Sequence, residues 1–333
     1  MKHNFKITAI LLGMFILTQF IGLYVVDYYS PVKVIDGEAV NVSSPDLPFD
    51  MALPKVESSA EYYGLFFFIL IAFVFAILIM FLLTKFEWAI ILKLWFFVVV
   101  IIALSISFFV LTNKLGIEKT FLEIPLIAVA AALPLAFIKI YKKEFLIHNL
   151  TELFIYPGIA AVFVPILSIP TIIILLILIS VYDMWAVWKS GIMQKMVKYQ
   201  MDKLNILAGF FIPHADKKTK QKIKLIREKY KGKKIPEKIM RKKLKINVAI
   251  LGGGDVIFPI IAAGVVLKTA TINLPFGLPS FVGGIGPALL VTAGATLGLG
   301  YLFFISEKKK FYPAMPFITA GIFLGMLLGW IIF

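Results

Sequence analysis

The feature that most limits what this chain can fold into is its succession of long apolar segments. Runs of about 18 or more apolar residues can cross the roughly 30 Å hydrocarbon core of a bilayer as helices. Such segments are predicted near 7–26, 63–83, 88–111, 121–138, 153–167, 169–188, 247–267, 279–305 and 311–333. Of the 333 residues 60% are hydrophobic and only 16% are charged, and mean hydropathy is +0.94. The sequence therefore predicts an all-α, polytopic membrane protein with about nine transmembrane helices.

Two of these segments leave the count open. The first resembles a signal peptide in position, but its apolar run of about 20 residues exceeds the usual 7–15 and no A-x-A-like cleavage site follows. We therefore expect an uncleaved helix. The fifth segment is short and contains Pro157 and Pro165, so eight spans remain an alternative. Proline is tolerated in membrane helices when neighbouring groups satisfy the freed backbone.

The distribution of lysine and arginine predicts the orientation. Lys2 and Lys6 precede the first segment, whereas residues 27–62 contain seven acids and only two lysines. Because basic residues accumulate on the cytosolic side, the amino terminus is expected in the cytosol. Nine spans then place residues 139–143, 189–246 and 308–310 inside and the carboxyl terminus outside.

The segment 189–246 divides the chain and is strongly basic. It holds 19 Lys or Arg against four acids. Nucleic-acid binding is one interpretation, but we expect positive-inside anchoring, with residues 192–204 forming a helix on an anionic leaflet. No nucleic-acid partner is predicted. The expected organisation is a six-span half over 1–188, a basic cytosolic loop over 189–246 and a three-span half over 247–333.

Two acids lie well inside the predicted spans, Asp183 in LILISVYDMWAVW and Asp255 in AILGGGDVIF. Ionisable side chains are costly at such depth, which makes each a candidate functional residue. Either one alone could equally be a neutral, hydrogen-bonded acid or a cation ligand in a transporter.

The depth of the two acids links them. Asp183 precedes the predicted span end at Trp188 by five residues, and Asp255 follows the predicted span start at Asn247 by eight. At about 1.5 Å per residue, the acids lie roughly 8 and 12 Å from the cytosolic boundary. Two such carboxyl groups share one proton, so one acts as an acid and the other as a base. The pair could activate water and protonate a peptide carbonyl without a metal or a covalent intermediate.

Three motifs resemble those of a known family. Tyr182–Asp183, Gly252–Gly253–Gly254–Asp255 and the PAMP sequence at 313–316 are similar to the YD, GxGD and PAL motifs of presenilin and signal peptide peptidase intramembrane aspartyl proteases, most nearly the archaeal presenilin homologues. The motif order, the nine spans and the hydrophilic loop also match. The resemblance implies catalysis by Asp183 and Asp255 and cleavage of transmembrane segments. It also implies that Pro313, Ala314, Met315 and Pro316 shape the active site and contact substrate. Met315 departs from the usual Leu, a nearly volume-conserving change.

The residues of these motifs also have readings of their own. Gly252, Gly253 and Gly254 allow the backbone to unwind or another chain to approach closely. Pro259 lacks an N–H and cannot satisfy the carbonyl of residue 255. Tyr182 either packs near the acids or is an interfacial aromatic, and the two prolines of PAMP either shape the site or simply begin a helix.

Other function classes have little support. His3, His148 and His214 are predicted at flanks or in loops, there is no H-E-x-x-H, and the chain has no cysteine. We expect no metal, cofactor or nucleotide site, and we assign Gly294 and Gly298 to helix packing. The predicted function is an intramembrane aspartic endopeptidase acting on transmembrane segments in the bilayer. The alternatives are a transporter or ion-leak channel using the same acids, although no repeat relates the halves, and a noncatalytic scaffold.

Overall fold

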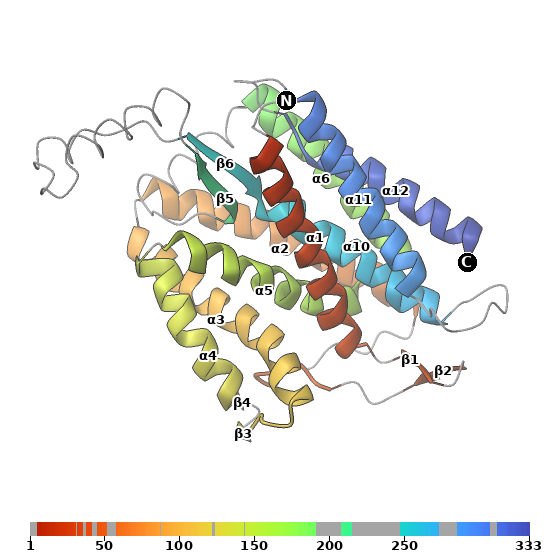
Figure 1. Ribbon diagram of the computed structural model, residues 1–333, viewed down its shortest axis with the longest axis horizontal. Helices are drawn as coiled ribbons and strands as arrows, with labels where there is room; N and C mark the ends of the chain where they lie inside the picture. Colours follow the sequence, from red (N-terminus) through yellow and green to blue (C-terminus); the bar gives the residue numbers. More distant parts are fainter. Residues whose placement is uncertain are drawn as a thin grey trace, which may run out of the picture.

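The computed structural model describes residues 5–30, 32–35, 38–41, 45–51, 58–86, 88–121, 124–142, 144–190, 208–214, 247–272, 285–306 and 312–333. Over these residues the chain forms nine α-helices (Figure 1). They are α1 (Phe5–Tyr28), α2 (Ser59–Lys85), α3 (Ala89–Lys114), α4 (Leu126–Phe137), α5 (Phe145–Phe163), α6 (Ile169–Trp185), α10 (Gly253–Ile272), α11 (Ile285–Ile305) and α12 (Met315–Ile332). A π-helical turn, Ile138–Lys142, extends α4; a 3-10 turn, Val164–Ile166, follows α5; and a π-helical turn, Ala186–Ser190, extends α6.

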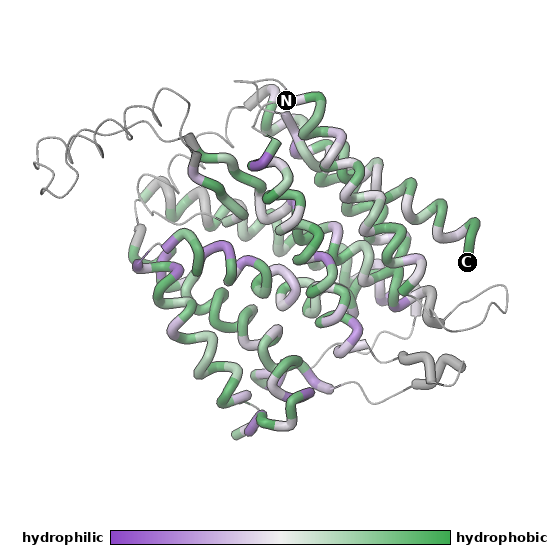
Figure 2. The backbone as a smooth tube through the Cα atoms, in the orientation of Figure 1, coloured by the Kyte–Doolittle hydropathy of each residue, from purple (hydrophilic) through white to green (hydrophobic). Residues whose placement is uncertain are grey.

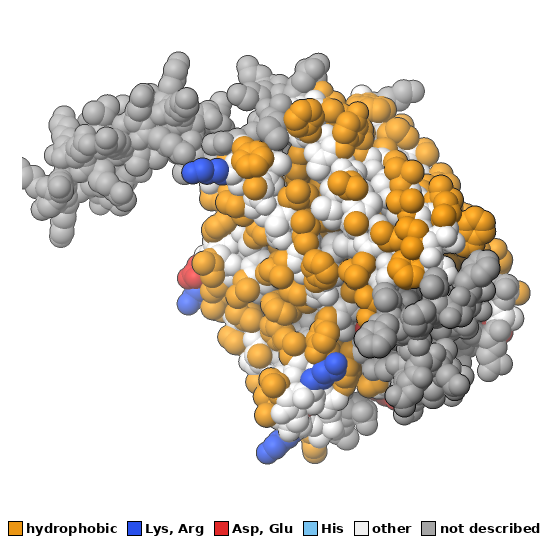
Figure 3. Space-filling model, turned by 45° about the vertical axis from the view of Figure 1, so that its right-hand side comes forward, with side chains coloured by type: hydrophobic (Ala, Val, Ile, Leu, Met, Phe, Trp, Pro, Cys, Tyr) orange, Lys and Arg blue, Asp and Glu red, His pale blue; other side chains and the backbone are white. Residues whose placement is uncertain are grey.

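The helical, polytopic membrane architecture predicted from the sequence is confirmed. In the described part of the chain, six helices are long and apolar enough to cross a membrane. Hydrophobic residues predominate along the helices, and hydrophilic residues lie mainly near helix ends and along the first half of α5 (Figure 2). Figure 3 shows apolar side chains spread over the face in view, with only a few basic side chains, most of them near its edge. Such a surface is typical of helices that face lipid.

Helix α10 lies at the centre of the bundle. It contacts α1, α5, α6, α11 and α12, so the two sequence halves form one core. Its residues from Val256 to Leu267 are almost all buried. The first segment, expected to be an uncleaved helix, is α1 and packs against α5, α10 and α11. The fifth segment, despite Pro157, is the continuous helix α5.

The glycines assigned to helix packing lie where α11 meets α12. A side-chain carbon added at Gly294 would collide with the backbone of Gly321, and one added at Gly298 would collide with the backbone of Phe317. Small residues allow helix backbones to approach closely in a membrane. The packing role predicted for Gly294 and Gly298 is therefore confirmed.

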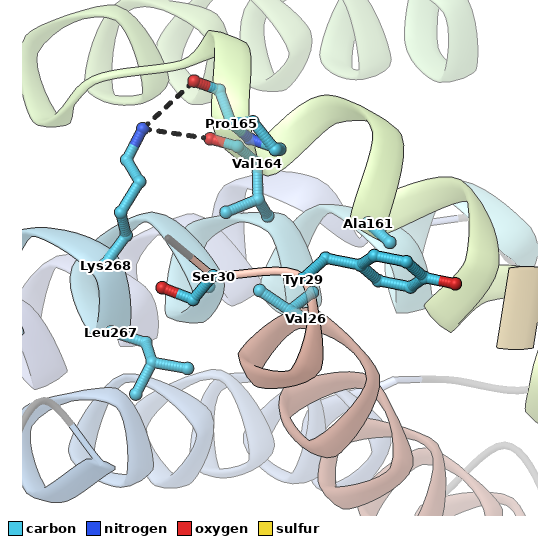
Figure 4. Close-up of a pocket in the computed structure, with 9 residues that line it drawn as sticks. Val26, Tyr29, Ser30, Ala161, Val164, Pro165, Leu267 and Lys268 are labelled. Atoms are coloured by element: carbon cyan, nitrogen blue, oxygen red, sulfur yellow. Dashed lines mark hydrogen bonds between the residues drawn. The ribbon is translucent and has the colours of Figure 1, made fainter. Parts of the chain in front are cut away.

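A lysine binds the carbonyl end of α5 at the far end of α10 from Asp255. Lys268 Nζ donates to the carbonyls of Val164 and Pro165 at 3.3 and 3.2 Å (Figure 4) and to that of Leu167 at 2.9 Å. The last carbonyls of a helix have no intrahelical partner, and a cation there opposes the negative end of the helix dipole. Lys268 also lines a small pocket together with Val164 and Pro165. It lies thirteen residues after Asp255, or about 20 Å along the helix, so the pocket is separate from the acids.

The structure also contains three two-stranded antiparallel sheets, and two of them lie where helices were predicted from the sequence. They are β1 (Val32–Ile35) with β2 (Glu38–Asn41), β3 (Thr120–Phe121) with β4 (Ile124–Pro125), and β5 (Gly209–His214) with β6 (Asn247–Gly252). The prediction that the seventh span begins at Asn247 is wrong, because residues 247–252 form β6 and the helix begins at Gly253. The predicted helix start at 121 is wrong for the same reason, since β3 occupies 120–121, β4 occupies 124–125 and the helix α4 begins at Leu126. The predicted surface helix at 192–204 lies outside the described residues.

Candidate active site

Asp255 lies in the first turn of α10, at the point where β6 becomes a helix. Gly252 ends the strand and Gly253 begins the helix, so Asp255 is the third helical residue. Its carboxyl group lies against Gly252, whose backbone N–H interacts favourably with the carboxylate. An acid at the third helical position facing the cap residue is the arrangement found in the acidic half of a capping box. Asp255 is therefore fixed by the strand-to-helix junction.

Asp183 lies near the end of α6 and is bound by the first residues of another helix. Met315 N–H donates to Asp183 Oδ2 at 3.1 Å, and the N–H of Ala314 is a second donor. Ala314 caps α12, Met315 is its first residue and Pro316 follows. The first N–H groups of a helix have no intrahelical acceptor and carry partial positive charge. The PAMP segment therefore presents two free donors to Asp183.

The structure brings Asp183 and Asp255 together. Helices α6, α10 and α12 contact one another, and the charge on Asp183 acts on Asp255. One turn before Asp183, Ser180 Oγ donates to Thr319 Oγ1 at 2.9 Å, which links α6 to α12 inside the core. The depth of Asp255 was counted from the sequence in helical residues from Asn247, and this count was wrong. Residues 247–252 form a strand, which rises about 3.3 Å per residue.

The three glycines before Asp255 have different surroundings. A side-chain carbon added at Gly253 would lie 2.8 Å from the hydroxyl oxygen of Tyr156, and one added at Gly252 would lie 3.1 Å from Asp255 Oδ2. At Gly254 the nearest atom would be 3.7 Å away, in the ring of Phe258. Gly253 thus lets the backbone lie close to Tyr156 of the same chain. Gly254, in contrast, is exposed and leaves space beside Asp255.

The structure adds polar residues that the sequence analysis missed. Helix α5 begins at Phe145, not at 153, and this places His148, Glu152 and Tyr156 at four-residue spacing on one buried face. The expectations that His148 lies in a flank and that only two acids are embedded are therefore wrong. The spacing of HNLTELFIY was the available signal. The Tyr156 hydroxyl interacts electrostatically with both Glu152 and Asp255.

Tyr182 does not join this group. Its side chain is 46% exposed, and its ring lies 6.2 Å from that of Trp185. Of its two readings, the interfacial aromatic fits this position better. Pro313 and Met315 are buried beside the N-terminus of α12, and Pro316 occupies a position where a missing N–H has little cost.

The site consists of two carboxyl groups. Asp255 lies in the first turn of α10, and Asp183 is bound by the N-terminus of α12. Shared protonation gives the pair one acid and one base, which suits activation of a water molecule and protonation of a leaving amine. Among the described residues, no group of three or more His, Asp or Glu side chains has the arrangement of a metal site. The nearby backbone is extended in β6, which pairs with β5, and the first N–H groups of α12 bind Asp183.

Comparison with known proteins agrees with this architecture. The family described as "Signal-peptide peptidase, presenilin aspartyl protease" matches residues 39–333. Two solved structures of a presenilin family intramembrane aspartate protease also match. The one in space group C222 has a TM-score of 0.57 and 16% identity, over 98% of this chain and 99% of its own. The one in P2 has a TM-score of 0.53 and 17% identity, over 97% of each chain. No curated protein sequence matches.

Proposed function

This chain belongs to the signal-peptide peptidase, presenilin aspartyl protease family, and we propose that Asp183 and Asp255 are its two catalytic residues. Family membership supports the protease interpretation of these acids over the transporter interpretation. The protein is an aspartic endopeptidase of the membrane, and its substrates are membrane-spanning proteins. The observation that carries the assignment is the packing of α6, α10 and α12 against one another, which brings the two acids near enough for the charge on Asp183 to act on Asp255.

In the proposed reaction, the deprotonated member of the pair takes a proton from water as the water attacks the peptide carbonyl. The protonated member donates its proton to the carbonyl oxygen, and the proton on the pair then passes to the leaving nitrogen. Two N–H groups from Ala314 and Met315 hold Asp183, and the N–H of Gly252 holds Asp255. These bonds orient both carboxyl groups before substrate binds.

We further propose that the substrate binds as an extended strand along β6. One edge of β6 pairs with β5, and in the described part of the chain no strand pairs with its other edge. An extended peptide can add to such an edge through main-chain hydrogen bonds. Because β6 leads directly into Gly254 and Asp255, a strand bound there would place its carbonyls beside the acids. Gly254, Pro313 and Met315 are the residues proposed to shape this path.

Purified protein and a labelled single-span substrate in detergent or liposomes provide the direct test. Cleavage within the span supports the proposal, and sequencing of the new termini locates the scissile bond. An intact substrate in the presence of folded protein would contradict it. Transport of protons or cations without cleavage would favour the transporter instead.

The pH dependence of cleavage is expected to show an optimum with loss on both sides. At low pH both carboxyl groups are protonated and no base remains, whereas at high pH both are ionised and no acid remains. A hydroxyl-bearing peptide isostere should inhibit because it mimics the tetrahedral intermediate. Rates over pH 4–9, with and without the isostere, check this. Loss of activity with a chelator and none with the isostere would point to a metal enzyme.

Substrates with helix-breaking residues near the cytosolic third of the span are expected to be cut faster than Leu-rich ones. A helical substrate hides its carbonyls in its own hydrogen bonds, so the scissile region must unwind before water attacks. A bulky side chain at Gly254 should obstruct the unwound strand while both acids remain. A substrate pair that differs only by Gly or Leu at the scissile region tests the first point, and Gly254→Leu tests the second. Equal rates together with a fully active Gly254→Leu enzyme would contradict the unwinding step.

We propose that the amino terminus is cytosolic and the carboxyl terminus is outside. The start of α1 and the β5–β6 sheet lie at one end of the bundle, and the β1–β2 and β3–β4 sheets lie at the other end (Figure 1). This arrangement supports a common side for the amino terminus and the basic loop 189–246. The chain is a multi-pass membrane protein. We retain the division into 1–188, 189–246 and 247–333 as a proposal for its sequence organisation.

A further inference from the structure

A buried ionic cluster joins α5 to the π-helical turn that extends α4, apart from the two proposed catalytic acids. Lys139 Nζ is 2.6 Å from Glu152 Oε1, and these side chains are only 5% and 3% exposed. Removing both charges from water is costly, and their attraction offsets this only if other hydrogen bonds complete the arrangement. The proposed reaction does not use this pair. Its position therefore requires another explanation.

The cluster binds both backbone groups of one residue in β5. Lys139 Nζ lies 3.2 Å from His148 Nδ1, and an ammonium group only donates, so Nδ1 accepts. In the neutral ring Nε2 then carries the hydrogen, and it donates to the carbonyl of Gly209 at 2.9 Å. Glu152 Oε1 accepts from the N–H of Gly209 at 3.3 Å. The charged cluster thus binds the N–H and the carbonyl of a single residue, Gly209.

Asn149 continues this attachment along the strand. Its Nδ2 donates to the carbonyl of Phe211 at 3.1 Å, and its Oδ1 accepts from the N–H of the same residue at 3.1 Å. The edge of β5 that faces away from β6 is therefore bound by side chains of α5. Gly209 has φ of 132°, and a side chain there would strike the carbonyl of Leu251. This makes glycine necessary at the attachment point.

The attachment leads to Asp255 in two steps. Gly209 is paired with Gly252 in the β5–β6 ladder, and the N–H of Gly252 binds the carboxyl group of Asp255. A second route runs along α5, because Tyr156 lies one turn after Glu152 and its hydroxyl rests against Gly253. Both routes join Glu152 to the segment that carries Asp255.

We propose that Glu152, held by Lys139 and His148, is a positioning residue for Asp255, acting through Gly209 of β5 and its partner Gly252. The proposal rests on the catalytic role proposed above for Asp255. Glu152 itself touches neither the substrate nor the reacting atoms. Its carboxylate fixes β5 against α5, and the paired strand sets the start of α10. Small displacements of a catalytic group, of about 1 Å, can lower rates by about 10²-fold.

Two double variants separate positioning from stability. Lys139→Met with Glu152→Leu removes the ion pair without leaving a buried charge, a change that is often tolerated by folded proteins. Lys139→Met with Glu152→Gln is equally neutral but keeps an oxygen for Gly209. We expect kcat to fall about 10- to 100-fold in the first variant, with KM within about threefold. The second variant should recover most of kcat.

Titration with the hydroxyl-bearing isostere distinguishes misplacement of Asp255 from loss of folded enzyme. If Asp255 is misplaced, the number of inhibitor-binding sites per protein stays unchanged, and the inhibition constant rises by the same factor as kcat falls. Loss of folded protein lowers the number of sites and leaves the constant unchanged. Lys268→Met is the matched control, because it removes another hydrogen-bonded, partly buried lysine far from the acids and should leave the constant unchanged. A normal constant in the Lys139→Met, Glu152→Leu variant would overturn the proposal.

Amide exchange in residues 208–214 gives a readout that does not depend on proteolysis. The amide of Gly209 should exchange faster in the Lys139→Met, Glu152→Leu variant, and faster also in His148→Phe, which keeps the ion pair and an aromatic ring beside Phe211. Unchanged exchange in both variants would refute the anchoring of β5. If exchange is faster in these variants but Asp255→Ala still cleaves substrate, the anchoring of β5 stands and the catalytic assignment of Asp255 is refuted.

Discussion

Replacement of Asp183 or Asp255 by alanine is expected to lower kcat/KM by at least about 10³-fold while the protein stays folded. Each acid supplies what the other lacks, since the pair needs one proton donor and one acceptor. Removal of either leaves water without its base or the carbonyl without its acid. The double variant should therefore be no less active than either single variant. Cleavage of a labelled single-span substrate measures all three effects.

Asp46→Ala is the matched control for these variants. Asp46 is exposed in the 45–51 segment, in the part of the chain that follows β2, and its removal should leave cleavage unchanged. Thermal unfolding in detergent should give similar midpoints for all the variants and the unmodified protein. Substantial cleavage by Asp183→Ala or Asp255→Ala would show that the two acids are not the catalytic pair, whatever the fold.

Gly253→Ala is expected to lower activity by about 10- to 100-fold, which is a large effect for one methyl group. The added carbon would lie 2.8 Å from the hydroxyl oxygen of Tyr156 and 3.0 Å from its Cε1. Tyr156 is buried in the core and cannot move away freely. The start of α10 must therefore shift, and Asp255, two residues later, shifts with it. Initial rates at saturating substrate report this displacement directly.

The cause of the Gly253→Ala effect can be isolated by a second change. Tyr156→Leu removes the colliding atoms, so the combined variant should be more active than Gly253→Ala alone, which gives a favourable coupling between the two sites. Gly300→Ala is the control, because a side-chain carbon at Gly300 meets no atom within 4 Å. If the two effects simply add, contact with Tyr156 is not the reason for glycine at 253.

The positions of the acids were predicted better than the elements that carry them. Asp183 and Asp255 were identifiable because ionisable residues are rare in apolar segments and their motifs follow in a fixed order. The start of α10 was predicted six residues too early, because the apolar residues of NVAILG suit a buried strand and a helix equally. Only pairing with β5 decides for the strand, and β5 lies more than thirty residues earlier in the chain.

The roles of Glu152 and His148 could not be found by counting embedded acids. The fifth span was predicted to begin at 153, which left both side chains outside it. In the structure α5 extends to Phe145 because its polar residues find partners in β5 and in Lys139. Burial of a polar side chain depends on such partners, and they come from segments distant in sequence.

The sequence by itself determined the membrane setting, the helical fold and the two acids, because apolar length and rare embedded charge are properties of the chain that need no partner. The tertiary structure alone decided how the acids are held. The N–H groups of α12 reach Asp183 across 132 residues of sequence, and the β5–β6 pair sets Asp255. Hydrogen bonds between distant segments depend on distances of about 3 Å, and such distances exist only after the helices have packed.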